Sequence, residues 1–353
     1  MSKKRLLSGD TPTGKLHLGH WVGSVEKRVQ LQDDYDCFFI IANLHAFTTR
    51  SDRPKEIHQS VIDIMMDYLS VGIDPKKSVI FLESEVPAIY ELTFLLSMLI
   101  PFPRVMRNPT IKDEIRDKEL GDNYSFGFLS YVIAQAADIL CFRSDIVPVG
   151  EDQLPHLELT REVARKFNQL YCGVSSHTED ADYLKAGGLF PITEAKVGRV
   201  KRLVGLNGPN EQGQLLKMSK SLNNAILLSD DTDTIQKKIM GMYTDPNRLK
   251  ATDPGQIDNN PLWIFHDTFN PDFAWVEEAK DKYRTGRIGD VECKRKLIEV
   301  LEVFIKPIRE RRQVFEADKK QVLDILKDGC ERANVVAEET FRLVKEKIDQ
   351  KFF

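Results

Sequence analysis

The stretch Thr11-Pro-Thr-Gly-Lys-Leu-His-Leu-Gly-His20 follows a short apolar run. It indicates how the N-terminal half of the chain folds. Gly14 suits a tight turn after a strand, and Gly19 lets a ligand approach the backbone where a helix begins. The imidazoles of His17 and His20 flank Gly19. The stretch therefore predicts a strand, a turn and a helix N-terminus that can hold a nucleotide phosphate.

A second stretch, Lys217-Met-Ser-Lys-Ser221, lies nearly two hundred residues further along the chain. It places two ammonium groups three residues apart beside two serine hydroxyls, after a Gly-containing loop that could close over a polyphosphate. Each stretch has a structural alternative, in which the histidines cap a helix and the lysines face solvent. Paired in this order, the two stretches favour an ATP site.

The composition is that of a soluble globular protein with about two domains. Of the 353 residues, 42% are hydrophobic and 29% are charged, and the net charge of −4 gives no global attraction to nucleic acid. No apolar run approaches the roughly 18 residues that span a bilayer, and the start of the chain lacks a signal-peptide core, so we expect a cytoplasmic protein without a membrane partner. The five cysteines form no CxxC pair, and neither a disulfide framework nor a metal site is predicted.

Apolar runs of strand length alternate with amphipathic helical stretches in the N-terminal half, as in a doubly wound parallel α/β sheet. Strands are expected at 4–8, 37–42, 78–82 and 145–150, with an insertion at about 86–122. Beyond residue 228 the spacing becomes wholly helical, with helices expected at 230–242, 261–269, 271–283, 291–317 and 319–351. We therefore predict a Rossmann-like domain over 1–228, including the 217–221 loop, and an all-helical domain over 229–353.

The paired motifs resemble those of class I aminoacyl-tRNA synthetases. The segment from Tyr131 to Asp138, continued by Asp145–Gln153 and His156–Arg161, is similar to that of the bacterial-type tryptophanyl-tRNA synthetases. This resemblance implies a ligase that activates L-tryptophan with ATP, carried with Mg²⁺, and transfers it to its tRNA. It also implies a homodimer and an anticodon-binding role for the helical domain, in which basic residues such as Lys237, Lys238, Arg309, Arg311 and Arg312 would contact tRNA, although each is individually typical of a solvated helix face.

Amino-acid activation needs no general base, because the substrate carboxylate is already ionised, but it needs charge stabilisation as pyrophosphate leaves. Two histidines at a helix start and two lysines on a loop supply that charge, so the predicted catalytic residues are His17, His20, Lys217 and Lys220. By resemblance, the predicted ATP-binding residues also include Thr11, Pro12, Thr13, Gly19, Gly150, Glu151, Asp152, Val200, Met218, Ser219 and Ser221.

An acid on an apolar helix, as Asp138 is, can accept the indole N–H of tryptophan while apolar neighbours surround the ring. From composition alone, Asp138 could instead be an N-cap or half of a buried ion pair. Tyr131 and Gln135 share its helical face and are predicted pocket walls. Gln153 is expected to reach the substrate amino group, and His45 is either a pocket residue or a structural histidine.

The sequence departs from common family members in its full His-x-Gly-His motif, in Gln135 where methionine is common, and in the unaligned residues 103–123. These differences affect pocket details rather than the reaction class. Three other hypotheses stay open: a tyrosyl-tRNA synthetase, a nucleotidyltransferase, and a non-catalytic synthetase paralogue that acts in regulation.

Overall fold

The computed structural model describes residues 3–117, 119–150, 153–197, 203–250 and 252–352. Its contacts group the chain into two compact units, and each is described by itself. The first unit comprises Met1–Gly14, Ser24–Lys201 and Asp318–Phe353, and the second comprises Lys15–Gly23 and Arg202–Ala317. In the described part of the chain, no helix is both long and apolar enough to cross a membrane.

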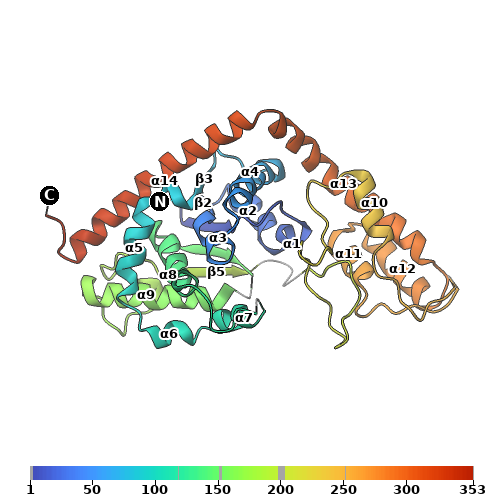
Figure 1. Ribbon diagram of the computed structural model, residues 1–353, viewed down its shortest axis with the longest axis horizontal. Helices are drawn as coiled ribbons and strands as arrows, with labels where there is room; N and C mark the ends of the chain where they lie inside the picture. Colours follow the sequence, from blue (N-terminus) through green and yellow to red (C-terminus); the bar gives the residue numbers. More distant parts are fainter. Residues whose placement is uncertain (1–2, 118, 151–152, 198–202, 251, 353) are drawn as a thin grey trace. The chain divides into compact units, whose positions relative to one another are not determined.

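Five parallel strands form the sheet of the first unit, in the order β3-β2-β1-β4-β5 (Figure 1). They are β1 (Arg5–Asp10), β2 (Asp36–Ile41), β3 (Ser78–Leu82), β4 (Ile146–Val149) and β5 (Glu194–Val197). The order reverses between β1 and β4, and in such a sheet ligands bind at the carboxyl ends of the strands beside that point. The predicted doubly wound parallel fold is confirmed.

The central strands are buried on both faces, which explains why they read as continuous apolar runs. In β2, the side chains from Cys37 to Ile41 are at most 4% exposed. The edge strand β5 was not predicted. Its residues Glu194 and Ala195 are exposed, so it has no apolar run that would mark it in the sequence.

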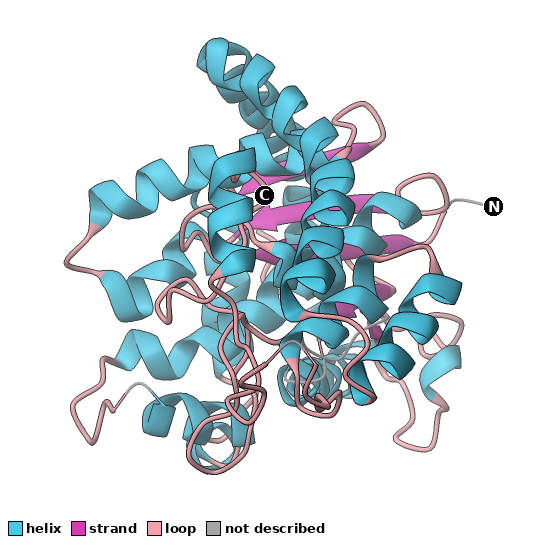
Figure 2. Ribbon diagram, turned by 90° about the vertical axis from the view of Figure 1, so that its right-hand side faces the viewer, coloured by secondary structure: helices cyan, strands magenta, loops and turns pink. Residues whose placement is uncertain are grey.

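Helices lie on both sides of the strands (Figure 2). In the first unit they are α2 (Glu26–Leu31), α3 (Asn43–Arg50), α4 (Pro54–Val71), α5 (Pro87–Ser97), α6 (Phe102–Met106), α7 (Pro109–Asp117), α8 (Phe126–Cys141), α9 (Leu154–Cys172) and α14 (Lys319–Lys347). Two of these helices end at a glycine. Gly72 ends α4 with φ 102° and Gly173 ends α9 with φ 70°, both in the left-handed region that glycine tolerates.

The last helix, α14, packs along the edge strand β3 and against α4, α5 and α8 (Figure 1). A Cβ at Gly329 would lie 1.8 Å from the backbone oxygen of Ile80, so glycine permits this close approach. The amide N–H of Leu82 donates to Cys330 Sγ at 3.3 Å, which covers a free donor at the edge of the sheet. Contacts therefore group α14 with the sheet, whereas the boundary predicted near residue 228 places it in the helical domain.

A buried guanidinium ties two helices to the carboxyl end of β1. Arg28 of α2, with a side chain 2% exposed, donates to Asp10 Oδ2 at 2.6 Å and to the Tyr68 hydroxyl of α4 at 2.8 Å. It also donates to the backbone oxygen of Gly9 and to Ser24 Oγ. Because all these partners surround one fully desolvated charge, the turn that follows Asp10 starts from a fixed position.

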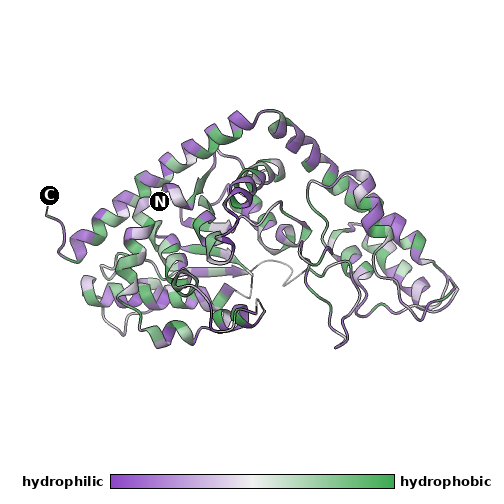
Figure 3. Ribbon diagram, in the orientation of Figure 1, coloured by the Kyte–Doolittle hydropathy of each residue, from purple (hydrophilic) through white to green (hydrophobic). Residues whose placement is uncertain are grey.

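The second unit consists of α1 (Leu18–His20), α10 (Thr232–Met240), α11 (Pro261–Phe269), α12 (Phe273–Arg284), α13 (Asp290–Ala317) and the loops between them. Asp231, Asn260 and Asp272 cap α10, α11 and α12 with side-chain acceptors. Residues of opposite hydropathy alternate along α13 and α14, as expected for amphipathic helices (Figure 3). The predicted helices beyond residue 228 are confirmed to within a few residues at each end.

Candidate functional site

In the second unit, a short antiparallel pairing joins the histidine motif to the segment that follows the lysine loop. Leu18 N–H donates to the Ile226 carbonyl and Leu228 N–H donates to the Leu16 carbonyl, each at 3.0 Å. His17 faces Leu227 across this pairing. The backbone thus fixes the start of α1 against the segment that follows the lysine loop.

Gly19 lies between the first histidine and the lysine loop. Its N–H is 3.3 Å from Met218 Sδ, and a Cβ at this position would lie 2.9 Å from the imidazole of His17. The rings of His17 and His20 are 3.7 Å apart between centroids, and His17 N–H donates to His20 Nδ1 at 3.0 Å. This hydrogen bond leaves Nε2 of a neutral His20 as the donor nitrogen. Imidazole and backbone N–H groups are therefore gathered where an anion could bind.

Lys220 turns toward the same helix start. Its Nζ donates to the Lys15 carbonyl at 2.8 Å, while Lys217 is exposed. Ser219 Oγ and Ser221 Oγ are 2.9 Å apart. The structure therefore brings His17, Gly19, His20, Met218 and Lys220 together, as the sequence predicts, with both serines on the same loop.

Asn224 shapes the lysine loop and was missed by the sequence analysis. Its buried amide accepts from Ser219 N–H at 2.7 Å and donates to the Lys217 carbonyl at 3.2 Å. A Cβ at Gly205 would lie 2.0 Å from this amide, so glycine makes room for it. An asparagine a few residues after a Lys-Ser motif was the available signal, since Asn side chains bond to nearby backbone.

At the switch point of the sheet, residues 11–13 follow β1 and Gly150 follows β4. Pro12 is buried, and Thr11 and Thr13 are partly exposed. Because β1 and β4 are neighbours, both predicted segments lie at adjacent carboxyl ends in the first unit. The predicted residues Glu151, Asp152 and Val200 lie outside the described residues.

Asp138 is in the interior of α8 and 7% exposed, and its Oδ1 has no hydrogen-bond partner among the described residues. It is not an N-cap, and no ion pair with a basic side chain is found for it in the described part of the chain. Its neighbour is another carboxyl group, that of Glu83, which is 2% exposed and accepts the N–H groups of Leu44 and His45 at 2.9 and 3.0 Å. Burial and the Glu83 charge raise the pKa of Asp138 well above its ordinary value, and burial raises the pKa of Glu83.

Tyr131 and His45 line the same region of the first unit. Their rings meet edge to face with centroids 4.7 Å apart. The Tyr131 hydroxyl is 3.2 Å from Nε2 of His156, a buried histidine of α9 that was not among the predicted pocket residues. Gln135 Nε2 donates to Gln153 Oε1 at 3.4 Å. The five predicted tryptophan-site residues thus fall into one pair, Gln135 with Gln153, and one aromatic contact, Tyr131 with His45, while Asp138 shares the helix of Tyr131 and Gln135.

The basic residues considered for tRNA are mostly engaged in ion pairs. Lys238 bonds to Asp230 at 2.7 Å, and Arg309 bonds to Glu302. Arg312 is 2% exposed and pairs with Glu316 at 2.9 Å. Lys237 is exposed on α10. The burial of Arg312 fits neither a contact with tRNA nor a solvated helix face.

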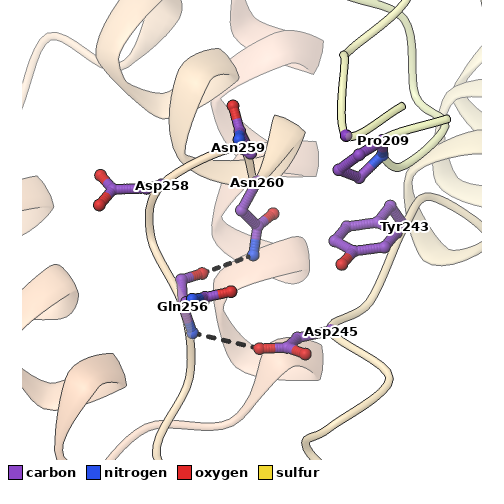
Figure 4. Close-up of a pocket in the computed structure, with 8 residues that line it drawn as sticks. Pro209, Tyr243, Asp245, Gln256, Asp258, Asn259 and Asn260 are labelled. Atoms are coloured by element: carbon purple, nitrogen blue, oxygen red, sulfur yellow. Dashed lines mark hydrogen bonds between the residues drawn. The ribbon is translucent and has the colours of Figure 1, made fainter. Parts of the chain in front are cut away.

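A polar hollow of about 190 Å³ occurs elsewhere in the second unit, beside Pro209 and Tyr243 (Figure 4). Its polar groups bond to one another: Gln256 N–H donates to Asp245 at 3.3 Å, and Asn260 Nδ2 donates to the Gln256 carbonyl at 3.1 Å. No predicted site residue lines it. The motif loops of the second unit and the Asp138–Tyr131 region of the first unit are therefore each a candidate site.

The family model described as tRNA synthetases class I (W and Y) matches residues 2–306. The chain belongs to this family. The resemblance of its two motifs to class I synthetases is thereby confirmed, and the nucleotidyltransferase alternative is not supported.

Individual relatives and solved structures match most of the chain. The tryptophan–tRNA ligase of Chlamydia caviae is 46% identical over 97% of this chain and 94% of its own length, and that of Clostridium longisporum is 44% identical over 100% and 99%. Among solved structures, tryptophanyl-tRNA synthetase from Campylobacter jejuni, complexed with ADP and tryptophan, superposes with a TM-score of 0.81 at 32% identity, covering 98% of this chain and 99% of the other. Tyrosyl-tRNA synthetase from Archaeoglobus fulgidus, at 20% identity, covers 88% of this chain and 90% of its own and shares the fold with a TM-score of 0.63.

Because the pKa of Asp138 is raised, the free energy of unfolding should depend on pH. In the unfolded chain this carboxyl group ionises near pH 4, so above that pH the folded protein binds more protons than the unfolded protein. The free energy of unfolding must therefore fall as pH rises between the unfolded and folded pKa values, by at most about 1.4 kcal/mol per pH unit for one proton. The substitution Asp138→Asn removes this proton uptake, so its stability relative to the wild type should increase from about pH 5 to pH 8.

Urea unfolding of both proteins across that pH range measures the effect. Asp324→Asn, which changes an exposed carboxylate on α14, is the control and should follow the wild-type pH profile. If the free energies of unfolding of the wild type and Asp138→Asn change with pH in the same way, the pKa of Asp138 is not raised in the folded protein.

Proposed function

We propose that this chain is a tryptophan–tRNA ligase, which activates L-tryptophan with ATP to tryptophanyl-adenylate and transfers the amino acid to its tRNA. Relatives of that name match at 42–46% identity over 97% or more of the chain. Within a family that serves tryptophan and tyrosine, the observation that carries the choice is the buried Asp138 carboxyl oxygen without a partner. An indole N–H satisfies that acceptor, with the rings of Tyr131 and His45 in the same unit.

We assign the activation chemistry to the motif residues of the second unit. His17, His20 and the Gly19 N–H offer donors to the ATP phosphates and ribose, and Lys217 and Lys220 offset the charge that develops on the leaving pyrophosphate. In the resting arrangement Lys220 Nζ is bonded to the Lys15 carbonyl, and Met218 Sδ lies against Gly19 N–H. Both contacts would have to be exchanged for phosphate contacts, so loop movement is part of the proposed step. Mg²⁺ would enter on the ATP phosphates, which are the oxygen ligands it prefers.

Thr11, Pro12, Thr13 and Gly150 are proposed to border the nucleotide from the switch point, with Glu151, Asp152 and Val200 assigned by resemblance. Ser219 and Ser221 would hydrogen-bond to phosphate oxygens, and Met218 would pack against the adenine. In the tryptophan pocket, Gln153, oriented by Gln135, would accept from the substrate ammonium group. These roles follow from the hydrogen-bonding capacity of each side chain.

We further propose a cytoplasmic homodimer in which the helical region from residue 229 onward binds the anticodon. Support for self-association comes from large apolar side chains of the first unit that are 62–82% exposed on helices α5, α6 and α8 or directly after α5: Phe94, Met98, Phe102 and Phe126. Exposed apolar side chains gathered on adjacent elements favour protein association.

The experiment that tests the function is amino-acid-dependent ATP–pyrophosphate exchange by the purified chain, followed by charging of total tRNA. We expect exchange with tryptophan and at least about a hundredfold weaker exchange with tyrosine, because tyrosine cannot supply the indole donor. Preferred exchange with tyrosine would make the chain a tyrosyl enzyme. Silence with both amino acids would favour the non-catalytic paralogue.

The lysine loop supplies a second prediction. Lys217→Ala or Lys220→Ala should lower the rate of tryptophan activation by about two or more orders of magnitude, with the dissociation constant of tryptophan changed less than about threefold, because the charge is needed as pyrophosphate leaves. Single-turnover adenylate formation and tryptophan titration measure the two quantities. Lys250→Ala, which changes an exposed lysine of the same unit, is the control. Wild-type activation rates in both loop variants would remove the pyrophosphate role.

A further inference from the structure

A buried chain of polar groups ends at the Tyr131 hydroxyl. Asn108 Nδ2 is 3.2 Å from His156 Nδ1, and His156 Nε2 is 3.2 Å from Tyr131 Oη. The three residues are 0%, 1% and 4% exposed. Since they come from the start of α7, from α9 and from α8, the chain links three helices of the first unit.

The orientation of the Asn108 amide is fixed by its other neighbour. Its Oδ1 accepts the N–H of Thr110 at 3.0 Å, as an N-cap of α7 does. The amide nitrogen must therefore be the group that faces His156, and it can only donate. It follows that His156 Nδ1 is an acceptor and carries no proton.

The proton of the neutral imidazole is consequently on Nε2, which donates to the Tyr131 hydroxyl oxygen. The hydroxyl hydrogen of Tyr131 is then directed away from His156. Glu114 of α7 is one acceptor for it: burial, followed by the charge of Glu114 and its hydrogen bond, raises the pKa of Tyr131. A proton on Nδ1 of His156 would set two donors face to face, so the Asn108 amide disfavours a proton at that nitrogen.

The second unit contains the same arrangement at residues that were not predicted to bind a substrate. Asn270 Oδ1 accepts Asp272 N–H at 3.0 Å, and its Nδ2 is 3.2 Å from His266 Nδ1. His266 Nε2 is 3.1 Å from the Cys293 carbonyl, to which it donates. Burial lowers the pKa of His266 to about 4, so this ring is neutral near pH 7. The fold thus uses an asparagine to fix a histidine tautomer twice, once toward a backbone carbonyl and once toward a pocket tyrosine.

We infer that His156 is a positioning residue for amino-acid binding: Asn108 fixes its Nε2–H tautomer, and that N–H orients the Tyr131 hydroxyl at the tryptophan pocket. The inference rests on the proposed function in assigning Tyr131 to the pocket. It adds His156 and Asn108, neither of which was predicted to affect substrate binding.

Substitutions at His156 test the positioning role. His156→Phe keeps a ring but removes the donor, and it should raise the KM for tryptophan in pyrophosphate exchange about tenfold while kcat changes less than about twofold. His156→Gln restores an N–H near the Nε2 position and should bring the KM back to within about threefold of wild type. The matched control is His266→Phe, which should leave the KM for tryptophan unchanged even if it lowers stability.

Equal KM values for His156→Phe and wild type, or no rescue by glutamine, would overturn the positioning role. A parent protein without tryptophan-dependent exchange would instead contradict the proposed function, and the tautomer would then be tested by spectroscopy alone.

The tautomer is measured independently of activity. Two-bond ¹H–¹⁵N spectra of the wild-type chain should show Nδ1 of His156 unprotonated and Nε2 protonated, with the ring assigned from the signals lost in His156→Gln. Asn108→Asp keeps the cap of α7 but replaces the donor by an acceptor, and it should move the proton to Nδ1. Asn270→Asp should add a proton at Nδ1 of His266 while Nε2 keeps its proton, because the Cys293 carbonyl can only accept, and it should leave His156 unaltered. A proton on Nδ1 in the wild type, or no change in Asn108→Asp, would refute the inference.

Discussion

The constraint that organises the first unit is a buried carboxyl oxygen, Oδ1 of Asp138, for which the described residues provide no donor. Leaving such a group unpaired costs about 1–3 kcal/mol, and the second carboxyl group at Glu83 adds repulsion. The surrounding fold maintains this state. Glu83 is held by two backbone N–H groups at the start of α3, and α8, which carries Asp138, is packed between α5 and α9. A ligand that brings a hydrogen-bond donor would satisfy this carboxyl oxygen.

In the second unit, the proposed function requires hydrogen-bond donors and cations placed for a polyphosphate. Backbone pairing of residues 16–18 with residues 226–228 fixes the start of α1, and the Asn224 amide fixes the lysine loop. Lys220, which is proposed to act on phosphate, would exchange its bond to the Lys15 carbonyl for a phosphate contact. The proposed charge stabilisation would thus combine a backbone held by hydrogen bonds with ammonium groups that change partners. The proposed amino-acid site, by contrast, consists of buried groups with fixed partners, such as the Asn108–His156–Tyr131 chain.

Much of the fold and of the candidate site could be predicted from the sequence, because the sequence patterns that mark them are local. Buried parallel strands appear as apolar runs such as 37–42, and the helices beyond residue 228 have clear heptad spacing. The lysine loop and the histidine motif are short and chemically distinctive. Features that depend on tertiary contacts were not accessible: β5 has exposed residues, α14 joins the sheet through Gly329, and the amide of Asn224 acts across a loop. Glu83 and His156 reach their functional neighbours only in the folded chain.

The central claim is that Asp138 selects tryptophan by accepting the indole N–H, and an analogue in which sulfur replaces that N–H group tests it most directly. Calorimetric titration of tryptophan and of its benzothiophene analogue should be compared for the wild type and Asp138→Ala. The account predicts that the wild type binds tryptophan at least about tenfold more tightly than the analogue, and that this preference falls below about twofold in Asp138→Ala. An equal preference in the two proteins would contradict it.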